Sequence, residues 1–166
     1  VKSKKLEDGY YWVRLTRFSE RTTEELRDAL KAAEKEAKNT GGIKGIVLDL
    51  RNNPGGLLDQ AVSVSDTFLD KGVIVSIKGR RDNTDRVYEA KKQGDDIHAP
   101  MVVLINAGSA SASEIVAGAL RDQKRALTVG EPWFGKGCVK NIITFSDGSG
   151  RKLTVALYYT PSGSSI

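Results

Sequence analysis

Residues 45–56 read GIVLDLRNNPGG and combine a strand pattern with a tight turn. Ile46, Val47 and Leu48 are consecutive apolar residues, which is typical of a strand that is buried on both faces. The polar residues, proline and paired glycines at 51–56 are a strong turn signal. The segment therefore predicts a buried strand that ends in a glycine-rich loop at one edge of a sheet.

The rest of the chain extends this strand–turn–helix pattern in both directions. Apolar runs alternate with amphipathic segments, and this alternation predicts a layered α/β fold with right-handed crossovers. The last two apolar runs, joined by the turn at 146–150, predict a C-terminal β-hairpin. The polar residues 78–96 are expected to form a hairpin or loop. Strands are expected at 9–15, 43–50, 73–77, 101–105, 126–129, 139–145 and 151–158, and helices at 22–39, 57–69 and 114–122.

The start of the first helix has the spacing of a capping box. Thr22 and Glu25 are three residues apart, so each side chain is expected to accept a hydrogen bond from a free backbone N–H of the first turn. The paired glycines Gly41 and Gly42 are expected to end this helix.

Composition limits the classes of protein that fit. The chain has 166 residues, of which 39% are hydrophobic, and this suits a single domain. Its formal charge of +5 is spread along the chain, and its basic clusters lack the interleaved aromatic residues of nucleic-acid-binding proteins. One cysteine, Cys138, excludes an internal disulfide, and one histidine, His98, excludes a zinc site built on several histidines. No apolar run reaches the roughly 18 residues of a membrane span, and no signal peptide is visible.

The glycine turn itself has chemical potential. Gly55 and Gly56 follow a buried strand, and functional sites in layered α/β proteins gather at the carboxyl ends of strands. Backbone N–H groups in such a turn can stabilise a developing oxyanion. An ordinary tight strand-to-helix turn is the alternative explanation of the same glycines.

A second turn, NAGSASASE at residues 106–114, follows the strand at 101–105. Small residues around Ser111 leave its hydroxyl accessible, and the start of the next helix favours negative charge nearby. The turn therefore contains a candidate nucleophile. Helix capping is the alternative role for these serines, and Ser113 is the expected cap.

A serine nucleophile needs a general base. His98 precedes the strand at 101–105, so it is expected at the opposite end of that strand from Ser111. Lys136 is the other candidate, and a lysine base must carry a neutral amine near pH 7. Trp133 and Phe134 come shortly before Lys136 and are expected to shield it from water.

These segments together resemble the C-terminal processing (tail-specific) family of serine peptidases. The matching motifs occur in the family's order along nearly the whole chain. They are GYYWVRL at 9–15, GIVLDLRNNPGG at 45–56, Asn106 with GSASASEI at 108–115, Gly130-Glu131 with FGKG at 134–137, and YYTPSG at 158–163.

The resemblance implies a mechanism with named residues. Ser111 would be the nucleophile and Lys136 its general base, in a Ser/Lys dyad that forms an acyl-enzyme. The oxyanion hole would use the backbone N–H of Ala112 and that of Gly55 or Gly56. No metal or cofactor is implied, and the substrates would be polypeptides cut near their C-terminal tails.

The resemblance also implies an architecture and a setting. The fold would be a layered ββα-type core related to the Clp protease and crotonase folds. Residues 1–166 would be a single peptidase core without the family's PDZ domain, and membrane proximity would come only through segments outside this sequence. A bacterial location outside the cytoplasm, in the periplasm or cell envelope, is expected.

One residue departs from the family pattern. Lys140 stands where the family often has a glutamine that is hydrogen-bonded to the catalytic lysine. A second ammonium that points inward would favour neutral Lys136 by like-charge repulsion, whereas one that points to solvent would leave Lys136 less well oriented.

Two other functions are therefore weighed against peptidase activity. The first is a catalytically impaired, protease-like module that binds peptides or acts as a scaffold. The second is a crotonase-type enzyme acting on acyl thioesters of coenzyme A, but the carboxylate pair expected of such a site is missing from the motifs.

Overall fold

The computed structural model describes residues 1–79, 85–94 and 97–166, with side chains except at 139–143, 152, 153 and 155. Residues 80–84 and 95–96 of the predicted hairpin or loop lie outside this description. The elements in chain order are β1 (Lys2–Glu7), β2 (Tyr10–Arg14), α1 (Thr22–Ala37), the 3-10 helix η1 (Lys38–Thr40), β3 (Gly45–Asp49), α2 (Leu58–Asp66), β4 (Lys71–Gly79), β5 (Arg86–Lys91), β6 (Met101–Ile105), α3 (Ala112–Asp122), β7 (Leu127–Gly130), β8 (Cys138–Thr144) and β9 (Gly150–Tyr159).

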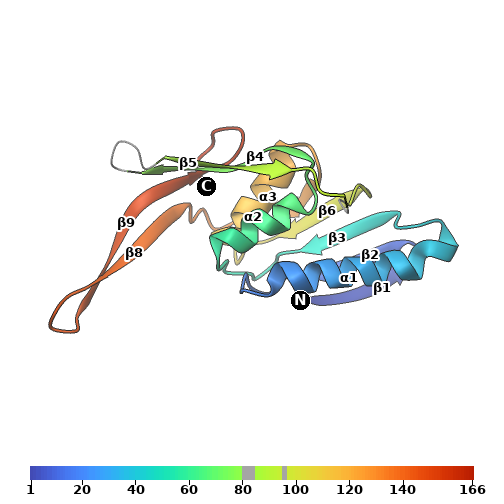
Figure 1. Cartoon of the computed structure of the whole chain (residues 1–166), viewed down its shortest axis with the longest axis horizontal. Helices are drawn as coiled ribbons and strands as arrows, with labels where there is room; N and C mark the ends of the chain where they lie inside the picture. The colour runs from blue at the N-terminus through green and yellow to red at the C-terminus, as the bar shows by residue number, and fades with distance from the viewer. Residues whose placement is uncertain (80–84, 95–96) are drawn as a thin grey trace.

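The strands form two sheets with α2 and α3 between them (Figure 1). The first sheet has the order β1-β2-β3-β6-β7, with β2, β3, β6 and β7 parallel and β1 antiparallel to β2. The second sheet is antiparallel, with the order β5-β4-β9-β8. Helix α3 contacts both β7 and β4, α2 contacts α3, β4 and β5, and α1 packs on α2 and β2. The predicted layered α/β fold is confirmed.

The core runs through all the layers. Ile46 and Leu48 of β3 are buried, as the apolar run predicted, and they belong to one hydrophobic cluster with Ile74 of β4 and Tyr158 of β9. Since both sheets contribute to the same cluster, the helices between them are covered on two sides.

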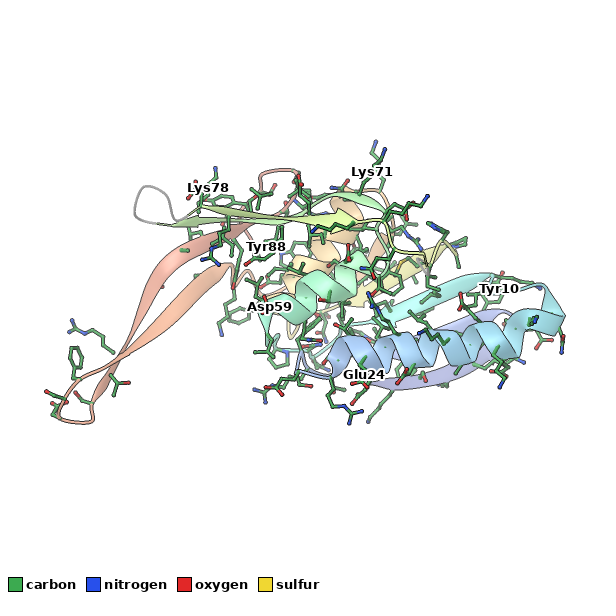
Figure 2. The ribbon with its side chains drawn as sticks, in the orientation of Figure 1. Tyr10, Glu24, Asp59, Lys71, Lys78 and Tyr88 are labelled. Carbon is green, nitrogen blue, oxygen red and sulfur yellow. The ribbon has the colours of Figure 1, made fainter. Side chains whose placement is uncertain are left out.

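The hairpin of β8 and β9 is confirmed, and it extends away from the helices (Figure 1). Figure 2 shows Lys78 and Tyr88 on the second sheet, and Tyr10 and Glu24 on the other side of the molecule. Within the described ranges no helix is both long and apolar enough to cross a membrane.

Strand β1 was not predicted. All six of its residues are exposed, and its sequence KSKKLE carries no apolar alternation that would indicate a strand. Its backbone nevertheless pairs with β2, and lysines on an edge strand discourage further pairing. Strand β5 pairs antiparallel with β4, so the described part of the segment 78–96 forms the hairpin that was one of its two predicted structures.

The predicted capping box at α1 is wrong. The Thr22 hydroxyl accepts a hydrogen bond from the Ser19 N–H (2.9 Å) and donates one to the Arg17 carbonyl (3.1 Å). The Glu25 N–H instead donates to the Arg21 carbonyl (2.9 Å). The hydroxyl is used by the chain that precedes the helix, so it is not available to the first turn.

Candidate active site

The glycine turn follows β3 and is held from inside by Asn53. This side chain is fully buried, and its amide donates to the Leu15 carbonyl (2.8 Å) and accepts from the Gly55 N–H (2.9 Å). Gly55 is buried, whereas Gly56 is exposed and has a φ of +147°. Among the described residues the Gly56 N–H has no hydrogen-bond acceptor. The turn therefore leaves one of its two glycine N–H groups free.

The serine turn leads from β6 into α3, and its three serines have different environments. Ser109 and Ser113 are fully buried, and their hydroxyls donate to the Leu50 carbonyl (2.8 Å) and the Asn53 carbonyl (2.9 Å). Ser111 is partly exposed, with φ +55° and ψ −112°. Such a backbone conformation costs a non-glycine residue about 1–3 kcal/mol and is found mainly at functional sites.

The predicted helix cap is wrong. Ser111 stands at the N-cap position of α3, and Ser113 lies inside the first turn. The Ser113 hydroxyl points instead to the glycine turn, 60 residues earlier in the chain. The N–H of Ala112, at the start of α3, has no hydrogen-bond acceptor among the described residues.

The two turns pack directly against each other. The Ala110 N–H donates to the Asn53 carbonyl (3.0 Å), and Asn106 exchanges hydrogen bonds with Asn52 (2.9 and 3.0 Å). A methyl group added at Gly55 would lie 2.9 Å from the Ser111 Cβ and 3.0 Å from the Ala112 nitrogen. Glycine is required here because it alone permits this approach and the φ of +100°.

Glu114 joins the serine turn to the loop that carries Lys136. Its fully buried carboxylate accepts hydrogen bonds from the backbone N–H groups of Ser111 (2.6 Å), Gly135 (2.6 Å) and Lys136 (2.9 Å). These bonds place the backbone of Lys136 close to that of Ser111, although the residues are 25 positions apart. The serine motif contains Glu114 but does not indicate this role, because the partners of Glu114 become its neighbours only in the folded chain.

The side chain of Lys136 is exposed. Within the described part of the chain, no hydrogen bond joins its ammonium to the Ser111 hydroxyl. The expected shielding by aromatic residues is wrong: Phe134 is 67% exposed, and Trp133 packs instead on the Arg121 guanidinium, 4.9 Å from its ring centre. The Phe134 N–H donates to the Ser109 carbonyl, which fixes the backbone while leaving the ring in solvent.

The two remaining candidate residues, Lys140 and His98, make no described contact with Ser111. The backbone of Lys140 pairs with Thr154 in the hairpin, and its side chain is outside the described residues. His98 lies before β6, with Nε2 3.7 Å from an Asp70 oxygen, so it is at the opposite end of the strand from Ser111, as predicted. The described residues contain no cluster of three or more potential metal ligands.

A cleft begins beside the glycine turn. It has a volume of about 540 Å³ and is lined by Gly56, Leu57 and Phe18, with residues 17 and 19–21 and Glu25 completing the wall. A partly exposed serine that lies against a turn with a free backbone N–H group is an arrangement suited to acyl transfer.

The layers and this site define a class: an α/β core of the Clp protease and crotonase type. The tricorn protease superposes on the chain with a TM-score of 0.57 at 10% identity over 90% of this chain and 13% of that chain, a likeness of fold alone. Residues 9–166 match the model of peptidase family S41, and the chain belongs to this family.

Relatives within the family are carboxy-terminal processing proteases. The chain is 51% identical over 162 residues to the carboxy-terminal-processing protease of Bartonella bacilliformis, covering 98% of this chain and 37% of the relative. It is 42% identical to the carboxy-terminal processing protease CtpA of Bacillus subtilis, covering 91% of this chain and 31% of that protein. The photosystem II D1 C-terminal processing protease superposes with a TM-score of 0.82 at 41% identity, over 94% of this chain and 39% of that one. The chain thus spans about a third of the length of these relatives.

Proposed function

We propose that the chain is the core of a serine endopeptidase in which Ser111 is the nucleophile and Lys136 the general base. One observation carries the proposal: the strained, partly exposed Ser111 lies against the glycine turn and is joined through Glu114 to the backbone of Lys136. Nucleophile, base and oxyanion donors must converge on one reacting carbonyl, and these contacts bring their backbones together.

The proposed reaction proceeds in two halves. Lys136, as the neutral amine, takes the proton of the Ser111 hydroxyl while the oxygen attacks the peptide carbonyl. The tetrahedral intermediate collapses to an acyl-enzyme as the amine product leaves with a proton from Lys136. Water then attacks the acyl group, again with Lys136 as base, and releases the acid product and the free Ser111 hydroxyl.

The oxyanion hole is proposed to use the N–H groups of Ala112 and Gly56. Both lack an acceptor among the described residues, whereas the Gly55 N–H is already donated to Asn53. The sequence left the choice between the two glycines open, and this hydrogen bond supports Gly56.

The family supports further proposals about substrate and setting. Substrates would be extended polypeptides that are cut near accessible C-terminal tails, outside the cytoplasm of a bacterium. Residues 1–166 would act as a single peptidase core, which the hydrophobic cluster shared by both sheets supports.

A catalytically impaired peptide-binding module is the second candidate. The observation that favours it is the exposed Lys136 side chain, which has no hydrogen bond to Ser111 in the described part of the chain. Such a module would bind the same polypeptides in the cleft beside Gly56 without turning them over.

Cleavage of casein separates the two functions, because only a peptidase turns it over. We expect the parent chain to cleave casein, and Ser111→Ala and Lys136→Ala to abolish cleavage, because the first lacks the nucleophile and the second the general base. Lys31→Ala, at an exposed position on α1, is the matched lysine control and should cleave like the parent. Retained cleavage in Ser111→Ala would exclude the proposed mechanism, and casein binding without cleavage by the parent would favour the binding module.

A further inference from the structure

Asn53 connects three parts of the molecule that meet at the site. Its amide spans from the Leu15 carbonyl after β2 to the Gly55 N–H in its own turn. Its backbone carbonyl accepts from the Ala110 N–H and from the Ser113 hydroxyl, both next to the nucleophile turn. Every one of these bonds is made inside the protein, since Asn53 is fully buried.

The side-chain bond decides which glycine N–H is free. The Gly55 N–H points into the protein, where it donates to the Asn53 side-chain oxygen. A turn with the Gly55 N–H facing solvent would leave this buried oxygen without a hydrogen-bond donor. The exposed Gly56 N–H is then the one that the turn presents to solvent.

The carbonyl bonds fix the distance between the two halves of the proposed oxyanion hole. Ala112 starts α3, and Ala110 and Ser113 on either side of it are both bonded to the Asn53 carbonyl. One residue thus holds the Gly56 side and the Ala112 side of the hole at once. Donors must be preorganised around the position of the oxyanion, and a misplacement of about 1 Å costs about 10²-fold in rate.

We propose that Asn53 is the positioning residue of the oxyanion hole: its amide occupies the Gly55 N–H so that Gly56 faces the substrate, and its carbonyl fixes Ala112. The proposal rests on the proposed peptidase function. Asn53 touches no reacting atom and acts only through the two turns.

Amide hydrogen exchange in the parent chain, resolved by NMR, tests the first half of the proposal and needs no turnover. We expect the Gly55 N–H to be strongly protected and the Gly56 N–H to exchange fast. In Asn53→Ala, protection at Gly55 should fall, while Asn53→Ser should retain part of it, because a serine hydroxyl can accept from the N–H two residues later. Equal exchange at both glycines in the parent chain would overturn the proposal.

Steady-state cleavage of a short peptide tests whether the side-chain bonds of Asn53 matter for turnover. We expect kcat to fall about 10²-fold in Asn53→Ala, with KM changed less than about threefold, and Asn53→Ser to recover part of the loss. A peptide boronate, which mimics the tetrahedral state, should lose affinity in parallel with kcat.

Ser65→Ala is the control for loss of a buried polar side chain away from both turns, because Ser65 is fully buried in α2 and donates a hydrogen bond to the Ala61 carbonyl. A kcat for Asn53→Ala within about threefold of Ser65→Ala would overturn the positioning role. A parent chain that neither cleaves peptide nor reacts at Ser111 would instead refute the proposed function, and the Gly55 exchange result would still stand by itself.

Discussion

At the scale of single residues, the site depends on the close approach of Gly55 to the serine turn. An added methyl group would lie 2.7 Å from the Ala110 carbonyl oxygen and 2.9 Å from the Ser111 Cβ. We expect Gly55→Ala to lower kcat/KM by about 10²-fold or more, because the turns must separate. Gly42→Ala is the control: its φ of +84° is also unfavourable for alanine, but nothing lies within 4 Å of the added methyl. Gly42→Ala should lower the free energy of unfolding by only about 1 kcal/mol and leave kcat/KM unchanged. Thermal unfolding measures the first quantity and peptide cleavage the second.

Equal activity losses in the two glycine variants would show that backbone strain, not the contact with the serine turn, explains the effect.

Glu114 is the second residue on which the site depends. Its carboxylate accepts three backbone N–H bonds, and a glutamine in its place would bring an NH₂ group against one of these donors. We expect Glu114→Gln to displace the loop of Lys136 and lower kcat by about 10²-fold, measured by peptide cleavage. Glu131→Gln, at an exposed position, should cleave like the parent. Normal kcat in Glu114→Gln would show that this clamp is not needed for catalysis.

At the scale of elements, the end of β3 is held by a buried charge. Burial alone would raise the pKa of Asp49, but hydrogen bonds from the Arg51 side chain and backbone and from Trp12 hold that pKa below its ordinary value. The folded state therefore favours the carboxylate. Its contribution to stability is fully present above the ordinary pKa of about 3.9 and is lost as pH falls through the lower folded pKa.

We expect Asp49→Asn to lower the Tm at neutral pH and to weaken the fall in Tm between about pH 4 and pH 2, followed by circular dichroism. Asp59→Asn on α2, labelled in Figure 2, is the control, since Asp59 is exposed and its carboxylate accepts no hydrogen bond and forms no ion pair among the described residues. An unchanged acid limb in Asp49→Asn would contradict a pKa lowered by these bonds.

Elements were predictable where local pattern and burial agree. The apolar run of β3 and its glycine turn follow from sequence because the residues that make the strand also fill the core. Strand β1 cannot be predicted in this way, because none of its side chains is buried and it forms only by pairing with the edge of β2.

The site was predictable only in part, for the same physical reason. Motif order indicated Ser111 and Lys136 as site residues, and these roles stay predictions. The positions of Asn53 and Glu114 depend on hydrogen bonds between segments some 20 to 60 residues apart, which local sequence does not encode. The exposure of Phe134 likewise depends on its backbone bond to Ser109.

At the scale of the whole molecule, two sheets enclose α2 and α3, and the site forms where β3 and β6 end (Figure 1). Helix α3 starts at the serine turn and packs on both sheets, so this turn is anchored to the most buried helix of the described chain. The proposed mechanism therefore uses the rigid centre of the fold for the nucleophile and a surface loop for the base.

The central claim, that Ser111 is the nucleophile, is tested most directly by reaction with a fluorophosphonate followed by mass spectrometry of the tryptic peptide 93–121. This peptide contains Ser109, Ser111 and Ser113, so fragmentation identifies the modified hydroxyl. We predict modification of Ser111 alone, slowed by about 10²–10⁴-fold in Lys136→Ala. Modification of another serine, or none at Ser111 in the folded parent chain, would contradict the account.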